Sequence, residues 1–155
     1  MPIAPMKTGE AGRALIKLAE GLALDAYPDP GTHGEPWTIG YGHTSRAGAP
    51  AVKRGMKITA LEAERILISD LAVFEAAVAK ALNRQPTQNQ FDAMVSIAFN
   101  IGAANFAHAH LVQFFNAGNI ARAADAFLNW DHAAGHVLPG LVKRRHAERE
   151  LFLKP

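Results

Sequence analysis

The sequence contains no cysteine. This absence excludes a disulfide framework, a thiolate nucleophile and any cysteine-ligated zinc or iron–sulfur site. The sequence also lacks an excess of charge of either sign, because 16 lysines and arginines are balanced by 14 aspartates and glutamates, which leaves a net charge of +2. So small a net charge gives little support to a nucleic-acid partner, a DNA-binding helix-turn-helix included.

Long hydrophobic runs are absent as well. No stretch of the sequence approaches the ~18 consecutive apolar residues that crossing a bilayer requires. The N-terminal region is interrupted by charged residues, so it has no apolar core of the kind a signal peptide needs (Glu10, Arg13, Lys17, Glu20). We therefore expect a protein without a signal peptide or transmembrane segment, kept in the cytoplasm unless something else exports or releases it.

The composition is that of an ordinary globular domain. Of the 155 residues, 49% are hydrophobic and 19% are charged. This length predicts one domain, residues 1–155, that buries roughly 68–70% of the surface of its unfolded chain. A monomer is the default expectation.

The first 44 residues combine one helix with a turn-rich segment. Leu15, Ile16, Leu18, Ala19 and Leu22 form an apolar helical stripe, and the preceding Thr8 is the expected N-cap. Residues 24–44 are interrupted by proline and glycine, which predicts turns and short strands. Within residues 37–43, WTIGYGH, the residues alternate between large side chains and a nearly bare face, and a bare face lets a ligand or another backbone approach closely.

The rest of the chain reads as helices. Two capping boxes, Thr59 with Glu62 and Thr87 with Gln90, predict where two of these helices begin. An apolar stripe runs along the first of them (Leu67, Leu71, Phe74, Val78, Leu82). Shorter helices are expected over about 107–117, 119–130 and 140–152.

Two carboxylates near the N-terminus are the first candidates for chemistry. Glu20 lies in the last turn of the predicted helix, where a negative charge is unfavourable for the helix dipole. Asp29 lies in the turn-rich segment that follows. Glycoside hydrolysis needs two such carboxyl groups, one as a proton donor and one that activates water or attacks directly. Two acids at this spacing are common, so the pair alone predicts little.

The surrounding motifs are far more specific. Residues 20–29, EGLALDAYPD, and 37–44, WTIGYGHT, closely resemble the phage-type lysozymes, glycoside hydrolase family 24. The resemblance continues through residues 90–96, QFDAMVS, and 98–102, AFNIG, and resumes at Trp130, at residues 137–145, VLPGLVKRR, and at Glu148. It thus covers about residues 10–153, almost the whole chain.

This resemblance implies an α+β, mostly α-helical, lysozyme-like fold with two lobes and a site between them. The small β-hairpin lobe would span about 13–58, a long connecting helix 59–82 and a helical lobe 83–155. The implied function is that of a muramidase, an endolysin that cuts the β-1,4 bond between N-acetylmuramic acid and N-acetylglucosamine in peptidoglycan and causes lysis. By the same resemblance, this protein would accumulate in the host cytoplasm and reach the wall through a membrane hole made by a partner protein, a holin.

The resemblance also implies site residues. Glu20 is the general acid, Asp29 activates or stabilises, and Thr38 positions the attacking water, with no cofactor. If the reaction inverts, the two carboxyl groups should be roughly 6.5–9.5 Å apart. Phe99 and Asn100 would contact substrate.

This chain departs from the family pattern in three places. Eight residues separate Asp29 from Thr38 where five are common, so Thr38 keeps its role only if the insertion bulges outward as a longer hairpin tip. Thr32 is the alternative threonine, and Thr38 is preferred because its WTIGYGHT context is intact. Residues 107–111, AHAHL, replace a frequent Ser-Thr pair, and residues 134–136, AGH, replace a usual Gly-Gly.

The histidines have an alternative interpretation as metal ligands. His108 with His110, and His132 with His136, have spacings that a metal could use. Gly135 breaks the second pair's pattern and no HExxH motif occurs, so no metal site is predicted. His43 is expected to have a structural role near the site, with Asp70 as its carboxylate partner.

The last helix is rich in basic residues. Two interpretations of these residues are open. They form a solvated face, or they give the helix a weak attraction to anionic surfaces (Lys143, Arg144, Arg145, Arg149). This leaves a second function open, a non-catalytic peptidoglycan-binding or membrane-active antibacterial protein.

Overall fold

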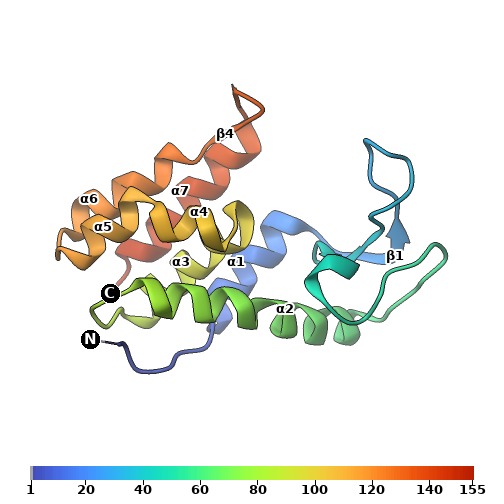
Figure 1. Cartoon of the computed structure of the whole chain (residues 1–155), viewed down its shortest axis with the longest axis horizontal. Helices are drawn as coiled ribbons and strands as arrows, with labels where there is room; N and C mark the ends of the chain where they lie inside the picture. The colour runs from blue at the N-terminus through green and yellow to red at the C-terminus, as the bar shows by residue number, and fades with distance from the viewer. Residues whose placement is uncertain (1) are drawn as a thin grey trace. The chain divides into compact units, whose positions relative to one another are not determined.

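A computed structural model describes residues 2–155. The chain divides into two compact units, one of residues 16–72 and one of residues 1–15 with 73–155. We call these the smaller and the larger unit. The fold is α+β and mostly α-helical, as predicted (Figure 1). No helix among residues 2–155 combines the length and the apolar character needed to cross a bilayer.

The smaller unit is built on a three-stranded antiparallel sheet. Helix α1 (Glu10–Glu20) ends in this unit and leads into β1 (Ala23–Tyr27), β2 (Thr38–Gly40) and β3 (His43–Thr44), which pair in the order β1-β2-β3. A short 3-10 helix (Ser45–Ala47) follows, and α2 (Ala60–Ala81) begins here and continues into the larger unit.

The register of β1 against β2 is interrupted by a bulge. Ala23 pairs with Gly40 and Tyr27 with Thr38, so two extra residues of β1 lie between the paired positions. The bulged segment pairs instead with residues 56–58, since Ala26 donates to the Met56 carbonyl and Ile58 donates to that of Leu24 (both 2.9 Å). The bulge therefore fits both neighbours of β1 without breaking the sheet.

The core of the smaller unit confirms the predicted alternation. Ile39 is fully buried, and it forms a hydrophobic cluster with the buried residues Val52, Ile58 and Ala63. Trp37 and Tyr41, two residues to either side of Ile39, pack against the same cluster, because alternate strand residues share one face.

Five helices and a hairpin follow α2 in the larger unit. They are α3 (Gln88–Ile101), α4 (Ala103–His108), α5 (His110–Asn116), α6 (Ile120–Ala126), which runs on into a 3-10 turn (Phe127–Asn129), the hairpin β4 (His132–Ala133) and β5 (His136–Val137), and α7 (Pro139–Leu153). Helix α3 packs on α7 and α5 packs on α6. Their core is aromatic (Phe91, Phe106, Phe115, Phe127, Phe152).

Both capping boxes are confirmed, but the predicted cap of α1 is wrong. Thr59 exchanges hydrogen bonds with Glu62, and Thr87 does so with Gln90. Thr8 instead gives both its amide and its hydroxyl to the Glu75 carboxylate, at 2.6 and 2.7 Å. The amides at the start of α1 are bound by a residue far along the chain, Asp92.

The predicted apolar stripe of α1 is only partly correct. Ile16 is fully buried, whereas the Leu18 side chain is 85% exposed. Leu15 is half-buried and Leu22 is exposed. The first residues of α1 belong to the larger unit and its last residues to the smaller unit. No single face of α1 therefore packs against one hydrophobic core along its whole length.

The single helix predicted over 107–117 is two helices. Helix α4 ends at His108, and Ala109, with an extended backbone, separates it from α5. The departure from the family at residues 134–136 forms the turn of the β4–β5 hairpin, where both Ala134 (φ 52°) and Gly135 (φ 80°) are left-handed.

Two of the four basic residues predicted to attract anionic surfaces are buried. Arg145 is fully buried and Arg144 is 7% exposed. Both point to the buried Glu148, with Arg145 Nε 2.8 Å and Arg144 Nε 3.3 Å from its carboxylate. Burial raises the pKa of Glu148, and the two arginines oppose that rise. Arg144 and Arg145 therefore lie in the interior as ion-pair partners of Glu148, and the prediction is wrong for both.

Candidate functional site

Glu20 is the last residue of α1. The helix ends there because Gly21 adopts a left-handed backbone (φ 72°) and donates to the Lys17 carbonyl at 2.9 Å. The half-buried Glu20 side chain lies over Gly42, in the turn between β2 and β3. A Cβ at Gly42 would lie 2.9 Å from Glu20 Oε1. The absence of a side chain at Gly42 thus lets the Glu20 carboxylate approach the turn, a contact that the sequence pattern did not predict.

Lys17, one turn before Glu20, ties this end of α1 to two other elements. Its ammonium group forms an ion pair with Glu64 of α2. The same group lies 5.7 Å from the centre of the Tyr41 ring, a cation–π distance. These contacts fix the last turn of α1, and Glu20 with it, against α2 and the β2–β3 turn.

Asp29 lies in the connection between β1 and β2, which contains the inserted residues. The backbone folds back on itself there, since Asp29 donates to the Gly34 carbonyl (3.0 Å) and His33 donates to the Asp29 carbonyl (2.8 Å). Oδ1 of the Asp29 carboxylate accepts the amides of Gly31 (2.8 Å) and Thr32 (3.0 Å). The insertion is therefore a closed hairpin tip.

The two candidate threonines have different surroundings. Thr38 opens β2, paired with Tyr27 on one side and Thr44 on the other, and is half-buried. Thr32 is exposed, and its hydroxyl donates to the Glu35 carbonyl at 2.5 Å. The Thr32 hydroxyl thus serves the loop, while Thr38 keeps its place in the sheet despite the insertion.

His43 follows Gly42 and contacts the predicted partner. Its Nδ1 lies 2.7 Å from Oδ2 of Asp70 on α2, and both side chains are buried. Its Nε2 lies 2.8 Å from the Pro50 carbonyl, a contact that no sequence pattern indicated. Burial raises the pKa of Asp70, and the hydrogen bond from His43 opposes the rise. His43 therefore joins β3, the loop after it and α2.

Comparison with known proteins adds the decisive observation. A family model described as "Phage lysozyme" matches residues 17–148. The chain belongs to the phage lysozyme family. It is 43% identical to an endolysin of Bacillus phage B103 over 96% of this chain, but it spans only about half (54%) of that relative's length. It is 40% identical to an endolysin of Salmonella phage P22, with 96% of this chain and 99% of the relative covered.

A solved structure supports the same family. The muramidase domain of SpmX from Asticaccaulis excentricus is 39% identical to this chain, with a TM-score of 0.85. The alignment covers 96% of this chain and 99% of that domain. The chain therefore matches that domain over almost its whole length.

The substrate contacts expected of this phage lysozyme, Phe99 and Asn100, lie at the end of α3 in the larger unit. The Phe99 ring is half-buried against Phe74, with ring centres 5.3 Å apart. Asn100 is exposed, and its Oδ1 accepts a hydrogen bond from Arg145 Nη2 at 2.8 Å. Asn100 is thus held by the buried arginine that the sequence had suggested for the surface.

A hollow of about 390 Å³ lies beside the junction of α4 and α5 in the larger unit. His108, Ala109, His110, Asn129 and Trp130 line it. The first three belong to the segment that departs from the phage lysozyme pattern. The segment thus lines one hollow together with Asn129 and Trp130, which the sequence could not indicate because they lie far along the chain.

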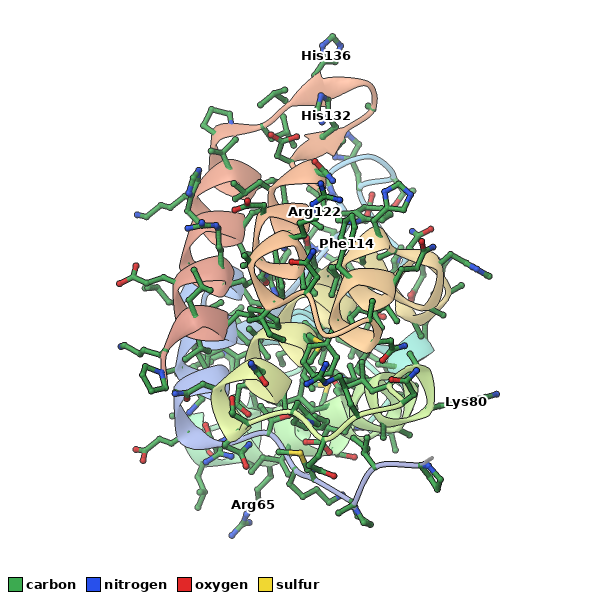
Figure 2. All side chains as sticks on the ribbon, turned by 90° about the vertical axis from the view of Figure 1, so that its left-hand side faces the viewer. Arg65, Lys80, Phe114, Arg122, His132 and His136 are labelled. Atoms are coloured by element: carbon green, nitrogen blue, oxygen red, sulfur yellow. The ribbon has the colours of Figure 1, made fainter. Side chains whose placement is uncertain are left out.

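The metal interpretation of the histidines has no cluster to support it. Among residues 2–155, no three side chains of histidine, aspartate or glutamate are grouped so that they could hold a metal ion. Figure 2 shows His132 and His136 on the β4–β5 hairpin, with His136 at its outer end. The register pairs His132 with Val137 and His136 with Ala133, so the two imidazoles are not cross-strand partners.

Proposed function

We propose that this phage lysozyme is a muramidase, an endolysin that hydrolyses the β-1,4 bond between N-acetylmuramic acid and N-acetylglucosamine in peptidoglycan. Glu20 is the general acid, Asp29 activates the water and Thr38 positions it. The proposal goes beyond family membership, because it names the bond that is cut and the residues that cut it.

The observation that carries the proposal is the position of the two carboxylates relative to β2. Glu20 Oε1 approaches Gly42, just beyond the end of this strand, while Tyr27, two residues before Asp29, pairs with Thr38 at its start. Inverting glycosidases hold their two carboxyl groups roughly 6.5–9.5 Å apart, with room for a water. Two carboxylates attached near the two ends of one short strand support a reaction that uses both, and inversion stays a prediction of the resemblance.

Each residue then has one task. Protonated Glu20 gives its proton to the glycosidic oxygen as the bond to the anomeric carbon breaks. Asp29 takes a proton from a water on the opposite face of the sugar, and the hydroxide oxygen bonds to the anomeric carbon. The Thr38 hydroxyl hydrogen-bonds that water and holds it in line. No step uses a metal or an organic cofactor.

The test is release of reducing ends from purified peptidoglycan by the wild type and by Glu20→Gln. We expect the variant to lose at least the hundredfold that general acid catalysis contributes. Asp25→Asn is the matched control, because Asp25 is an exposed carboxylate between the two site residues that pairs with Lys57 at 2.8 Å. The control should keep wild-type activity, and equal activity of Glu20→Gln would refute the assignment of the acid.

The second candidate, a wall-binding or membrane-active protein without hydrolysis, predicts a different result. Wild type and Glu20→Gln would both pellet with peptidoglycan and release no reducing ends. The structure weakens the membrane-active version, because Arg144 and Arg145 are buried and Arg149 is bound to Asp125 at 2.9 Å.

Access to the wall remains a prediction from the resemblance. It expects accumulation in the host cytoplasm, release through a holin-made hole and action as a monomer. Expression with and without a holin, followed by culture turbidity, tests it: lysis without the holin would contradict the expectation.

A further inference from the structure

The two oxygens of the Asp29 carboxylate are in different surroundings. Oδ1 accepts two backbone amides, from Gly31 at 2.8 Å and from Thr32 at 3.0 Å. Within residues 2–155, no hydrogen-bond partner of Oδ2 is found. A carboxylate oxygen has about two lone-pair positions, so the protein occupies those of Oδ1 and leaves those of Oδ2.

The loop that supplies these amides is closed by its own contacts. Asp29 and Gly34 are joined through the backbone at 3.0 Å. The Thr32 hydroxyl links the two sides of the tip, because it donates to the Glu35 carbonyl at 2.5 Å and accepts the Gly34 amide at 3.3 Å. The inserted residues thus build a rigid support for one oxygen of a single carboxylate.

We propose that Gly31 and Thr32 are positioning residues of the site: their amides hold Oδ1 of Asp29, and Oδ2 is the oxygen that takes the proton from the attacking water. This inference rests on the proposed function and adds to it the role of the insertion. The water O–H bond breaks as the Oδ2–H bond forms, and the hydroxide oxygen bonds to the anomeric carbon. The bond to the leaving oxygen breaks, and that oxygen receives the proton of Glu20.

Electrostatics and geometry support this division of the two oxygens. Two N–H donors stabilise negative charge on Oδ1 and fix the plane of the carboxylate without blocking Oδ2. A base held in one orientation stays in the productive rotamer. A misplacement of the base by about 1 Å can lower the rate on the order of a hundredfold. The loop that holds the inserted residues therefore supplies both donors to Oδ1.

A pair of glycine variants in the same loop tests the support. A Cβ at Gly31 would lie 3.1 Å from Asp29 Oδ1, whereas a Cβ at Gly34 would meet nothing within 4 Å. We expect Gly31→Ala to lower kcat about tenfold or more with KM changed less than about threefold. Gly34→Ala should match the wild type. Equal kcat for the two variants would overturn the proposal.

A second pair tests Thr32. Thr32→Val keeps the shape of the side chain and removes the hydroxyl that closes the tip, so kcat should fall about tenfold or more as Asp29 is misplaced. Thr32→Ser restores the hydroxyl and should restore kcat. If the serine variant is as slow as the valine variant while both keep the wild-type melting temperature, the hydroxyl does not position Asp29.

A third measurement separates this inference from the proposed function. In an NMR pH titration of the wild type, the Gly31 and Thr32 amide protons should shift together as the Asp29 carboxyl ionises, and both shifts should vanish in Asp29→Asn. This result stands even if the wild type releases no reducing ends, which would refute the proposed function alone. Amide protons that do not respond to Asp29 would refute the support itself.

Discussion

Nδ1 of His43 lies 2.7 Å from Oδ2 of Asp70, and both side chains are almost completely removed from solvent. His43 directly follows Gly42, over which Glu20 lies, so this buried pair fixes the turn beneath the proposed acid. The second nitrogen of His43 holds the Pro50 carbonyl, so the imidazole has a partner on each side.

Removing one member of this pair should be strongly destabilising. Asp70→Ala leaves the buried Nδ1 of His43 without its hydrogen-bond partner, and an unsatisfied buried polar group costs about 1–3 kcal/mol. Urea denaturation of the variant measures this loss. Asp25→Ala, which breaks an exposed pair with Lys57, is the control and should leave the midpoint nearly unchanged. Similar midpoints for Asp70→Ala and the wild type would show that the pair contributes nothing.

Gly42 should matter for activity beyond its effect on stability. Alanine there is strained by the left-handed backbone (φ 76°), and its Cβ would displace the Glu20 carboxylate. Gly55 has a similar φ of 83°, but a Cβ there meets nothing within 4 Å. Both Gly→Ala variants should lose about 1–2 kcal/mol of stability, which denaturation measures.

Only Gly42→Ala should also lose reducing-end release, by about tenfold or more at a temperature where both variants are folded. If Gly55→Ala loses as much activity, backbone strain explains the effect and displacement of Glu20 does not.

Asp92 shows why part of the structure could not be predicted. The capping boxes were readable because both partners lie three residues apart, within one helical turn. The amides at the start of α1 are instead bound by Asp92, which accepts from Gly9 at 2.9 Å and from Gly12 at 3.1 Å. Eighty residues separate Gly12 from Asp92, and no local pattern indicates such a partner. The same limit applies to Arg145. A run of basic residues predicts an exposed face, and only the structure shows that Arg145 contacts Glu148 and Asn100.

The candidate site could be predicted from one short stretch of chain, and its residue roles stay predictions. Glu20, Asp29 and Thr38 fall within nineteen positions, carried by family motifs that the inserted loop does not interrupt. The loop's own geometry was not predictable, because it depends on which amides face Asp29 and on the Thr32 hydroxyl.

Replacing Asp92 should destabilise the protein, because the amides at the start of α1 lose their hydrogen-bond acceptor. Asp92 is fully buried and also accepts the Gln88 side chain at 2.7 Å. Asp92→Ala leaves buried amide donors without a partner, and we expect a loss of about 2–4 kcal/mol in the free energy of unfolding. Asp125→Ala is the control, since Asp125 forms an exposed pair with Arg149 and should cost less than about 1 kcal/mol. Equal losses would mean that the cap contributes no more than a surface ion pair.

The β4–β5 turn predicts a gain in stability. Ala134 has a φ of 52°, a left-handed conformation that costs an alanine roughly 1–2 kcal/mol and a glycine almost nothing. Glycine gives the unfolded chain more freedom, and this entropic cost offsets part of the relieved strain. Ala134→Gly should therefore gain about 0.5–1 kcal/mol in net stability. Ala133→Gly, one residue earlier in the extended strand β4, should instead lose about 0.5–1 kcal/mol. Thermal unfolding of the two variants checks the sign at each position. A loss at Ala134 equal to the loss at Ala133 would show that the left-handed turn carries no strain, because only the shared entropic cost of glycine would then remain.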